Sequence, residues 1–190
     1  MTDFSYYEGL IKERLSEKRY NHSINVSKAA VELCERYGGN KEQARLAGIL
    51  HDITKEMPLE QQYAYIERNG ETLSALERNN SAVIHQKSGA AYCALELGIT
   101  DAQVLSAIRY HTTGRRDMAL LEKIVYTADL ISAERDYPDV EIMRSLAAQS
   151  IDEAMLYAIK YTINNLVSKT ELLHPDTVEC YNSILESRIK

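Results

Sequence analysis

Four of the five histidines lie where helical periodicity would turn their rings toward the interior of the protein. Each falls on a different predicted helix, in line with apolar residues that recur three or four positions away. Two aspartates join them, one directly after a histidine and one beside an inward-facing alanine. The six residues are His22, His51, Asp52, His85, His111 and Asp129.

Imidazole and carboxylate groups that meet in one interior predict a metal site. A single histidine on an apolar face is more often a core residue bonded to a carbonyl oxygen, but four of them favour ligation. Buried carboxylates need cations, and a pair of metal ions would satisfy two carboxylates and four neutral rings at once. Imidazole with carboxylate suits iron, manganese, cobalt or zinc. Because six ligands exceed what one ion with an open position would use, the count favours two ions.

The helices that position these residues follow from the apolar pattern. Apolar residues recur at intervals of three and four, and no segment has the alternation of a strand. The pattern predicts an all-α bundle of about nine to eleven helices, with a long helix over 151–168 and a terminal one over 176–188. Helix ends are predicted at Gly38-Gly39, Gly70, Gly98 and Gly114. Helix starts are predicted from capping-box spacing at Asn40, Thr100, Ser150 and Asp176.

Length, charge and cysteine content exclude several classes of protein. At 190 residues we expect a single domain over 1–190. Without a long apolar run or a basic leader we expect a cytoplasmic protein that has no membrane partner. A net charge of −6 opposes non-specific binding to nucleic acid. Three widely spaced cysteines predict reduced, buried thiols and no disulfide framework.

The six candidate ligands also carry a family resemblance, because their order resembles that of the HD-domain metal-dependent phosphohydrolases. Short segments around them narrow the resemblance to the YqeK family of symmetrical diadenosine-tetraphosphate hydrolases, which bind a di-iron centre. The segments are Arg-Tyr-Asn-His-Ser at 19–23, His-Asp-Ile-Thr-Lys at 51–55, His-Thr-Thr-Gly at 111–114 and Ala-Asp-Leu-Ile-Ser-Ala-Glu-Arg at 128–135.

The resemblance implies a fold, a reaction and a division of the ligands. It implies an HD-domain helical bundle with a motif core over about 19–138, followed by closing helices over about 139–190. It also implies symmetrical hydrolysis of diadenosine tetraphosphate to two ADP at a binuclear centre, with iron as the first choice of metal. One ion would be surrounded by His22, His51, Asp52 and Asp129. The other would be surrounded by Asp52, His85 and His111, with Asp52 as the bridge.

Basic side chains near these ligands are candidates for substrate contact, because a polyphosphate carries more negative charge than two metal ions neutralise. Lys55 lies one helical turn after His51, and Arg135 lies six residues after Asp129. Together with the bridging aspartate they form the predicted catalytic set, Asp52, Lys55 and Arg135. The predicted substrate-binding set is Arg19, Lys55, Thr112, Thr113 and Arg135, although Thr-Thr-Gly is also an ordinary helix end.

Other interpretations of the same residues stay open. The second interpretation is a nucleotidase, a cyclic-nucleotide phosphodiesterase or an alarmone hydrolase on the same metal scaffold. A non-catalytic sensor that binds nucleotide is a further alternative, although the complete ligand set argues against it. A homodimer is possible. The fifth histidine, His174, matches no part of the motif and is predicted to lie on the surface, in a loop before Pro175.

Overall fold

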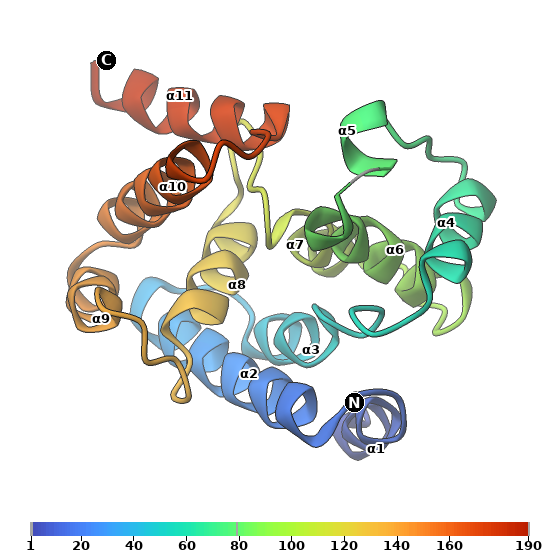
Figure 1. The fold of residues 1–190 in the computed structure, drawn as a ribbon. Coiled ribbons are helices and arrows are strands. Elements are labelled where there is room, and N and C mark those ends of the chain that lie inside the picture. The colour runs from blue at the N-terminus through green and yellow to red at the C-terminus, as the bar shows by residue number, and fades with distance from the viewer. Residues whose placement is uncertain (1, 79, 190) are drawn as a thin grey trace.

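The computed structural model describes residues 2–78 and 80–189, and over these residues the chain forms eleven α-helices and no β-strand (Figure 1). This confirms the prediction of an all-α bundle. The helices are α1 (Phe4–Arg14), α2 (Glu17–Tyr37), α3 (Lys41–Leu50), α4 (Leu59–Arg68), α5 (Ala75–Arg78), α6 (Ser81–Leu95), α7 (Ala102–Tyr110), α8 (Leu120–Ile131), α9 (Val140–Gln149), α10 (Ile151–Ser168) and α11 (Pro175–Ile189).

Most helix boundaries agree with the sequence signals. All five glycines that were predicted to end helices have positive φ angles, from 62° at Gly98 to 106° at Gly39. Two of the predicted starts are correct: Asn40 accepts the backbone N–H groups of residues 42 and 43, and Ser150 accepts that of residue 153. Local chemistry therefore determines where these helices begin and end.

Two predicted helix starts are wrong. The cap of α7 is Asp101 and not Thr100, because the Asp101 carboxylate accepts the N–H groups of residues 103 and 104. Helix α11 begins at Pro175, and the backbone N–H of Asp176 donates to the ring of His174. In both places a neighbouring side chain supplies the cap that the spacing assigned to another residue.

The N-terminal two thirds of the bundle is built around α2, which packs against α3 and α8, while α7 packs against α3, α6 and α8 (Figure 1). Gly48 permits the close contact of α2 with α3. A Cβ atom at this position would lie 2.6 Å from the Cα atom of Ser27, closer than real Cβ contacts occur. The main hydrophobic core fills the space between these helices, with fully buried members such as Val26, Ile49 and Val125.

Helices α9, α10 and α11 form the other end of the bundle, and α10 packs against α8, α9 and α11 (Figure 1). Their apolar faces make a second core that includes Met143, Met155 and Ile159. No described helix has the length and hydropathy needed to cross a bilayer. The three cysteines are free and buried, as predicted.

Candidate metal centre

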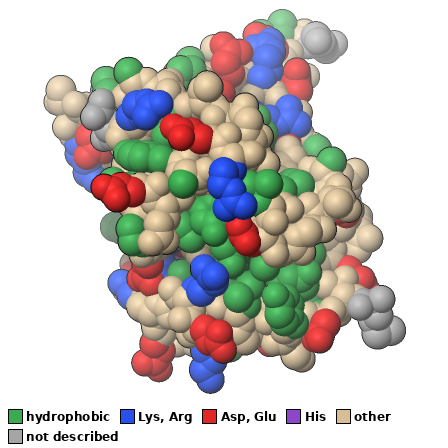
Figure 2. Space-filling view, turned by 90° about the vertical axis from the view of Figure 1, so that its right-hand side faces the viewer, with side chains coloured by type: hydrophobic (Ala, Val, Ile, Leu, Met, Phe, Trp, Pro, Cys, Tyr) green, Lys and Arg blue, Asp and Glu red, His purple; other side chains and the backbone are tan. Residues whose placement is uncertain are grey.

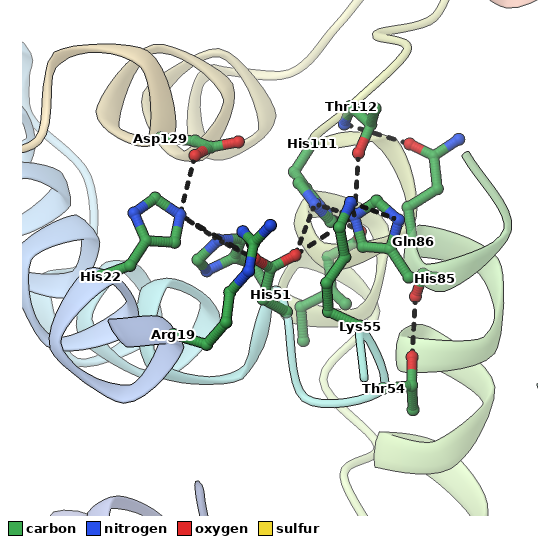
Figure 3. A network of polar contacts seen from close by, with 12 residues as sticks. Arg19, His22, His51, Thr54, Lys55, His85, Gln86, His111, Thr112 and Asp129 are labelled. Atoms are coloured by element: carbon green, nitrogen blue, oxygen red, sulfur yellow. Dashed lines mark hydrogen bonds and ion pairs between the residues drawn. The ribbon is translucent and has the colours of Figure 1, made fainter. Parts of the chain in front are cut away.

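The six candidate ligands come from five helices or the turns that follow them, and their side chains meet inside the bundle. Figure 3 labels five of them, and Asp52 lies between the histidines. His22 lies in the second turn of α2, and Asp129 lies near the end of α8. His85 lies in the second turn of α6. The adjacent residues His51 and Asp52 follow directly after α3, and His111 follows directly after α7, so three of the six ligands stand at helix ends.

Asp52 lies in the middle of this cluster, and its two carboxylate oxygens face different histidine pairs. Oδ2 lies 3.8 Å from Nε2 of His22 and 3.6 Å from Nε2 of His51. Oδ1 lies 3.2 Å from Nε2 of His85 and 3.7 Å from Nε2 of His111. A carboxylate held in this way has the geometry of a bridge between two cation positions.

The histidine rings approach one another through the same nitrogen atom. Nε2 of His51 lies 3.3 Å from Nε2 of His22, and Nε2 of His85 lies 3.0 Å from Nε2 of His111. Asp129 Oδ1 lies 3.0 Å from Nε2 of His22. Two overlapping groups have potential ligand atoms within 4.8 Å of one another: His22, His51 and Asp129, and then His51, Asp52 and His111.

Backbone carbonyl groups set the orientation of two of the rings. Nδ1 of His51 donates to the carbonyl oxygen of Gly48 at 2.8 Å, and Nδ1 of His111 donates to that of Ile108 at 2.7 Å. Because a carbonyl oxygen only accepts, each Nδ1 carries the hydrogen, which leaves Nε2 as the ring nitrogen that faces the cluster and can hold a cation. Imidazole ligands of metals are held in this way by the other ring nitrogen.

Burial and the neighbouring charged groups together determine the protonation of the cluster. Burial lowers the pKa of His51 to about 4 and that of His85 to about 3, so both rings are neutral at pH 7. Burial also acts to lower the pKa of His22, but the contacts with Asp129 and Glu134 outweigh it and raise that pKa. Burial would raise the pKa of Asp52, but the rings of His51, His111 and His85 outweigh it and hold that pKa well below its usual value. Neutral imidazoles beside ionised carboxylates are the donor set that a divalent cation requires.

Two arginines contact the carboxylates of the cluster. Nη1 of Arg19 donates to Oδ2 of Asp52 at 3.0 Å. Arg135 donates from Nη2 to Oδ1 of Asp129 and from Nε to the carbonyl oxygen of the same residue, the latter at 2.8 Å. Each arginine side chain is about one third exposed, so each joins the buried cluster to solvent.

Lys55 contacts the opposite side of the cluster. Its Nζ lies 3.1 Å from Nδ1 and 3.2 Å from Nε2 of His85. Burial lowers the pKa of Lys55, although the negative charge of Asp52 acts in the other direction. The hydroxyl of Thr112 lies 3.2 Å from Nε2 of the same histidine. Lys55 and Thr112, two of the five predicted substrate contacts, therefore lie against the ring of His85.

Thr113, the remaining predicted contact, is buried and bonded within the protein. Its hydroxyl accepts from Nε2 of Gln86 at 3.0 Å and donates to the carbonyl oxygen of Gly114 at 2.9 Å. Oε1 of Gln86 accepts the backbone N–H groups of both Thr112 and Thr113. Gln86 was not predicted, and it holds the turn that carries Thr112 beside His85.

Glu134 is a second residue that the sequence did not single out. Its Oε1 contacts Nδ1 of His22, on the side of the ring that faces away from the cluster. Ser132 donates to the same oxygen at 2.7 Å, and Asn25 donates to Oε2 at 2.8 Å. Glu134 belongs to the segment 128–135, which carries part of the family resemblance. A metal-bound imidazole needs a partner on its other ring nitrogen, and this requirement at His22 is the signal that could have identified the carboxylate.

The prediction that His174 lies on the surface is wrong. Its ring is buried because the segment between α10 and α11 folds against α5, and Nε2 lies 3.6 Å from Oε1 of Glu77. All five histidines are thus buried, and none is visible on the face shown in Figure 2. His174 nevertheless belongs to a different cluster from the six candidate ligands.

Buried carboxylates and imidazole nitrogens directed at one centre fit a divalent metal site, and comparison with known proteins agrees with this geometry. Residues 19–134 match the model of the HD domain, so the chain belongs to the HD domain family. Within it, the chain belongs with the symmetrical bis(5'-nucleosyl)-tetraphosphatases. The protein of that name from Bacillus subtilis is 38% identical over 172 residues, 90% of this chain and 92% of the relative.

Two further proteins extend the comparison. The symmetrical bis(5'-nucleosyl)-tetraphosphatase of Staphylococcus aureus is 38% identical over 185 residues, 95% of each chain. A crystal structure from Clostridium acetobutylicum, described as a predicted HD superfamily hydrolase involved in NAD metabolism, is 35% identical with a TM-score of 0.95. The match covers 98% of this chain and 99% of that one, so α9–α11 belong to the shared fold as well.

Proposed function

We propose that this protein hydrolyses diadenosine tetraphosphate symmetrically to two molecules of ADP, at a centre of two metal ions. The observation that carries the proposal is the placement of Asp52 with one oxygen toward each histidine pair. Relatives that bear the name symmetrical bis(5'-nucleosyl)-tetraphosphatase and align over nine tenths of the chain support the choice of substrate.

The ligands divide into two sets that share Asp52. The first set is His22, His51, Asp52 and Asp129. The second is Asp52, His85 and His111, and the position of His51 near both groups leaves it within reach of either ion. A ligand set of imidazole nitrogen and carboxylate oxygen is suited to binding iron, with manganese, cobalt or zinc as alternatives. A bound pair of such ions supplies an acidified water and polarised phosphoryl oxygens.

The side chains of the protein then bind and orient the phosphate chain. Arg135 and Arg19 reach from solvent to the two carboxylates. Among the contacts of the described residues, Arg19 keeps Nε and Nη2 free for phosphate oxygens, and Arg135 keeps Nη1 free. Lys55 supplies a third cation on the side of His85, beside the hydroxyl of Thr112. Fixed cations of this kind stabilise the charge that develops during phosphoryl transfer. We assign Lys55 and Arg135 to catalysis and Arg19 to substrate binding.

Isotope labelling tests the reaction directly. Protein purified without air is analysed for its metal content and then given diadenosine tetraphosphate in heavy-oxygen water, and the nucleotides are separated. We expect about two metal ions per chain and ADP as the only nucleotide product, with heavy oxygen in one ADP of each pair. Formation of AMP and ATP would overturn symmetrical cleavage.

A substrate panel separates the proposal from the other HD-type reactions. Nucleoside monophosphates, cyclic nucleotides and alarmones are assayed beside diadenosine tetraphosphate at equal concentration. Faster turnover of one of these compounds would assign the centre to that reaction. A protein that binds nucleotide, keeps its metal and turns over none of them would be a sensor. The homodimer and the cytoplasmic location stay predictions, and sedimentation analysis tests the first.

A further inference from the structure

The two ends of the metal cluster differ in the charges that surround them. At the His22 end, Asp129 contacts Nε2 of the ring and Glu134 contacts Nδ1, so two carboxylates flank one imidazole. Arg135 balances one of these charges through its contact with Asp129. At the His85 end no such carboxylate contacts the ring among the described residues apart from the shared Asp52.

At the His85 end, a lysine ammonium contacts the ring instead. The ammonium of Lys55 lies 3.1 Å from Nδ1 of His85 and is mostly buried. The ring of His111 at the same end is held by the carbonyl oxygen of Ile108, which carries no net charge. Arg19 contacts Oδ2 of the shared Asp52 on the His22 side, so the other formal charges sum to about zero at His22 and to one positive at His85.

The environment of Glu134 is built to hold its carboxylate in place. Both oxygens have partners, since Ser132 and His22 contact Oε1 while Asn25 donates to Oε2. Asn25 lies one helical turn after His22 on α2, so a single helix carries both the ring and the group that orients its acceptor. A loosely held surface carboxylate would not have three polar contacts.

We infer that Glu134 is a positioning residue that makes the His22 end the tighter of the two cation positions, so that this end fills first. This inference rests on the proposed binuclear centre. An anionic acceptor at Nδ1 fixes the tautomer and increases the electron density at Nε2, which strengthens its bond to a cation. The ammonium of Lys55 opposes cation binding at the other end by direct repulsion.

Titration of metal-free protein with Mn²⁺, followed by calorimetry and by electron paramagnetic resonance, tests the inference. We expect two separate binding steps in the wild-type protein, with an uncoupled Mn²⁺ signal during the first step and a spin-coupled signal during the second. Glu134→Gln should weaken the first step about 10–100-fold and leave the second within about threefold, the usual effect of changing a partner of a metal-bound imidazole.

Three further variants make the result specific. Glu32→Gln removes the same charge from an exposed position on α2 and should leave both steps unchanged. Asn25→Ala frees one oxygen of Glu134 and should weaken the first step by a smaller factor, which provides a test if Glu134→Gln does not fold. Lys55→Met should strengthen the second step and bring the two affinities closer together.

The outcomes separate this inference from the proposed function. Two equally tight ions in the wild-type protein, or a first step that Glu134→Gln leaves unchanged, would overturn the role of Glu134 while leaving the binuclear hydrolase intact. Wild-type protein that binds no Mn²⁺ and contains no other metal would overturn both. Loss of both steps in Glu134→Gln with a normal thermal transition would also overturn the inference, because it would show that the residue supports the whole cluster.

Discussion

Two buried clusters in this protein combine histidine with carboxylate, and in only one of them do the charged groups have their partners within the protein. In this cluster, formed by Glu77, Lys87 and His174, Oε1 of Glu77 lies 2.7 Å from Nζ of Lys87, and Oε2 accepts the backbone N–H of Ser74 at 2.8 Å. Lys87 also donates to the carbonyl oxygen of Thr72 at 2.9 Å. His174 accepts at Nδ1, so its Nε2 carries the hydrogen that faces Glu77.

The candidate metal centre has a different arrangement. Its ring nitrogens face each other in pairs, His22 with His51 and His85 with His111, at 3.3 and 3.0 Å. Such a pair is satisfied only by a proton on one ring or by a cation between the rings. Burial of histidine and carboxylate therefore does not by itself indicate a metal site. Acceptor groups that converge on one point without a donor between them indicate one.

Asp52→Ala should have the largest effect, because it removes the group that both histidine pairs share. We expect loss of bound metal and a fall in turnover on the order of 10³-fold or more, equivalent to at least about 4 kcal/mol. Elemental analysis and the labelled assay measure the two quantities on the same preparation. Full metal content in this variant would contradict the bridging role, and unchanged turnover would remove the centre from the reaction.

Glu77→Ala should act on stability and leave the metal untouched. It leaves the ammonium of Lys87 buried, 6% exposed, without its ion-pair partner. Breaking a buried pair on one side costs about 3–5 kcal/mol in the free energy of unfolding. Urea denaturation measures the loss, and elemental analysis should give the wild-type metal content. Loss of metal in this variant would contradict the separation of the two clusters.

The same residue predicts how stability depends on pH. Burial raises the pKa of Glu77, but the hydrogen bonds from Lys87 and Ser74 outweigh it and lower the pKa from 4.5 to about 2. The folded state therefore gains stability above pH 4.5 and loses it as the pH falls toward 2, by roughly 3 kcal/mol in total. The difference in unfolding free energy between wild type and Glu77→Gln should shrink between pH 6 and pH 3.

Arg135→Ala should separate binding of metal from catalysis. The side chain contacts Asp129 but is not itself a candidate ligand, so its loss should leave the six ligands in place. We expect wild-type metal content with turnover reduced by about 2–4 kcal/mol, or roughly 30–1000-fold. Arg116→Ala, which removes a charge on the exposed segment before α8, should retain full activity. Normal turnover in Arg135→Ala would exclude this arginine from the catalytic set.

The metal-centre cluster was easier to predict from the sequence than the cluster of Glu77, Lys87 and His174, for a physical reason. His22 and Asp129 lie inside amphipathic helices, whose periodicity determines the face that each side chain occupies. His85 lies on α6, which is buried on all sides from Val83 to Cys93, so its ring is in the interior whichever face it occupies. His174 lies in a connecting segment, and its burial depends on where α5 packs. Glu134 lies beyond the end of α8, so its return to His22 depends on the turn at Ser132, which periodicity does not describe.

Helix ends show the same limit on a smaller scale. The spacing of Thr100 and Gln103 fits a capping box, but Asp101 can cap the same helix one residue later. A carboxylate competes successfully with a hydroxyl for the first backbone N–H groups. The glycine signals were more reliable, because a positive φ angle restricts the position to few residue types. Helix ends that depend on the backbone conformation of one residue are therefore easier to predict than helix starts that depend on two side chains.

Gly48→Ala should give the smallest of these effects, and it alters the spacing of the metal-centre cluster without changing a ligand. The new Cβ would lie 2.6 Å from Cα and 2.9 Å from the backbone nitrogen of Ser27, so α2 and α3 must move apart. Since His22 lies on α2 and His51 follows α3, the distance between their rings should increase. Overpacking of this kind costs about 1–3 kcal/mol in stability.

Gly9→Ala provides the matched control, because no atom beyond the neighbouring residues and backbone of α1 lies within 4 Å of the Cβ it would add in the middle of this helix. This change should stabilise the protein by about 0.5–1 kcal/mol and leave Mn²⁺ affinity unaltered. If the rings of His22 and His51 hold the metal together, Gly48→Ala must weaken Mn²⁺ binding, whereas Glu77→Ala loses more stability and no affinity. Equal affinity in both variants would mean that the metal centre tolerates displacement of its helices.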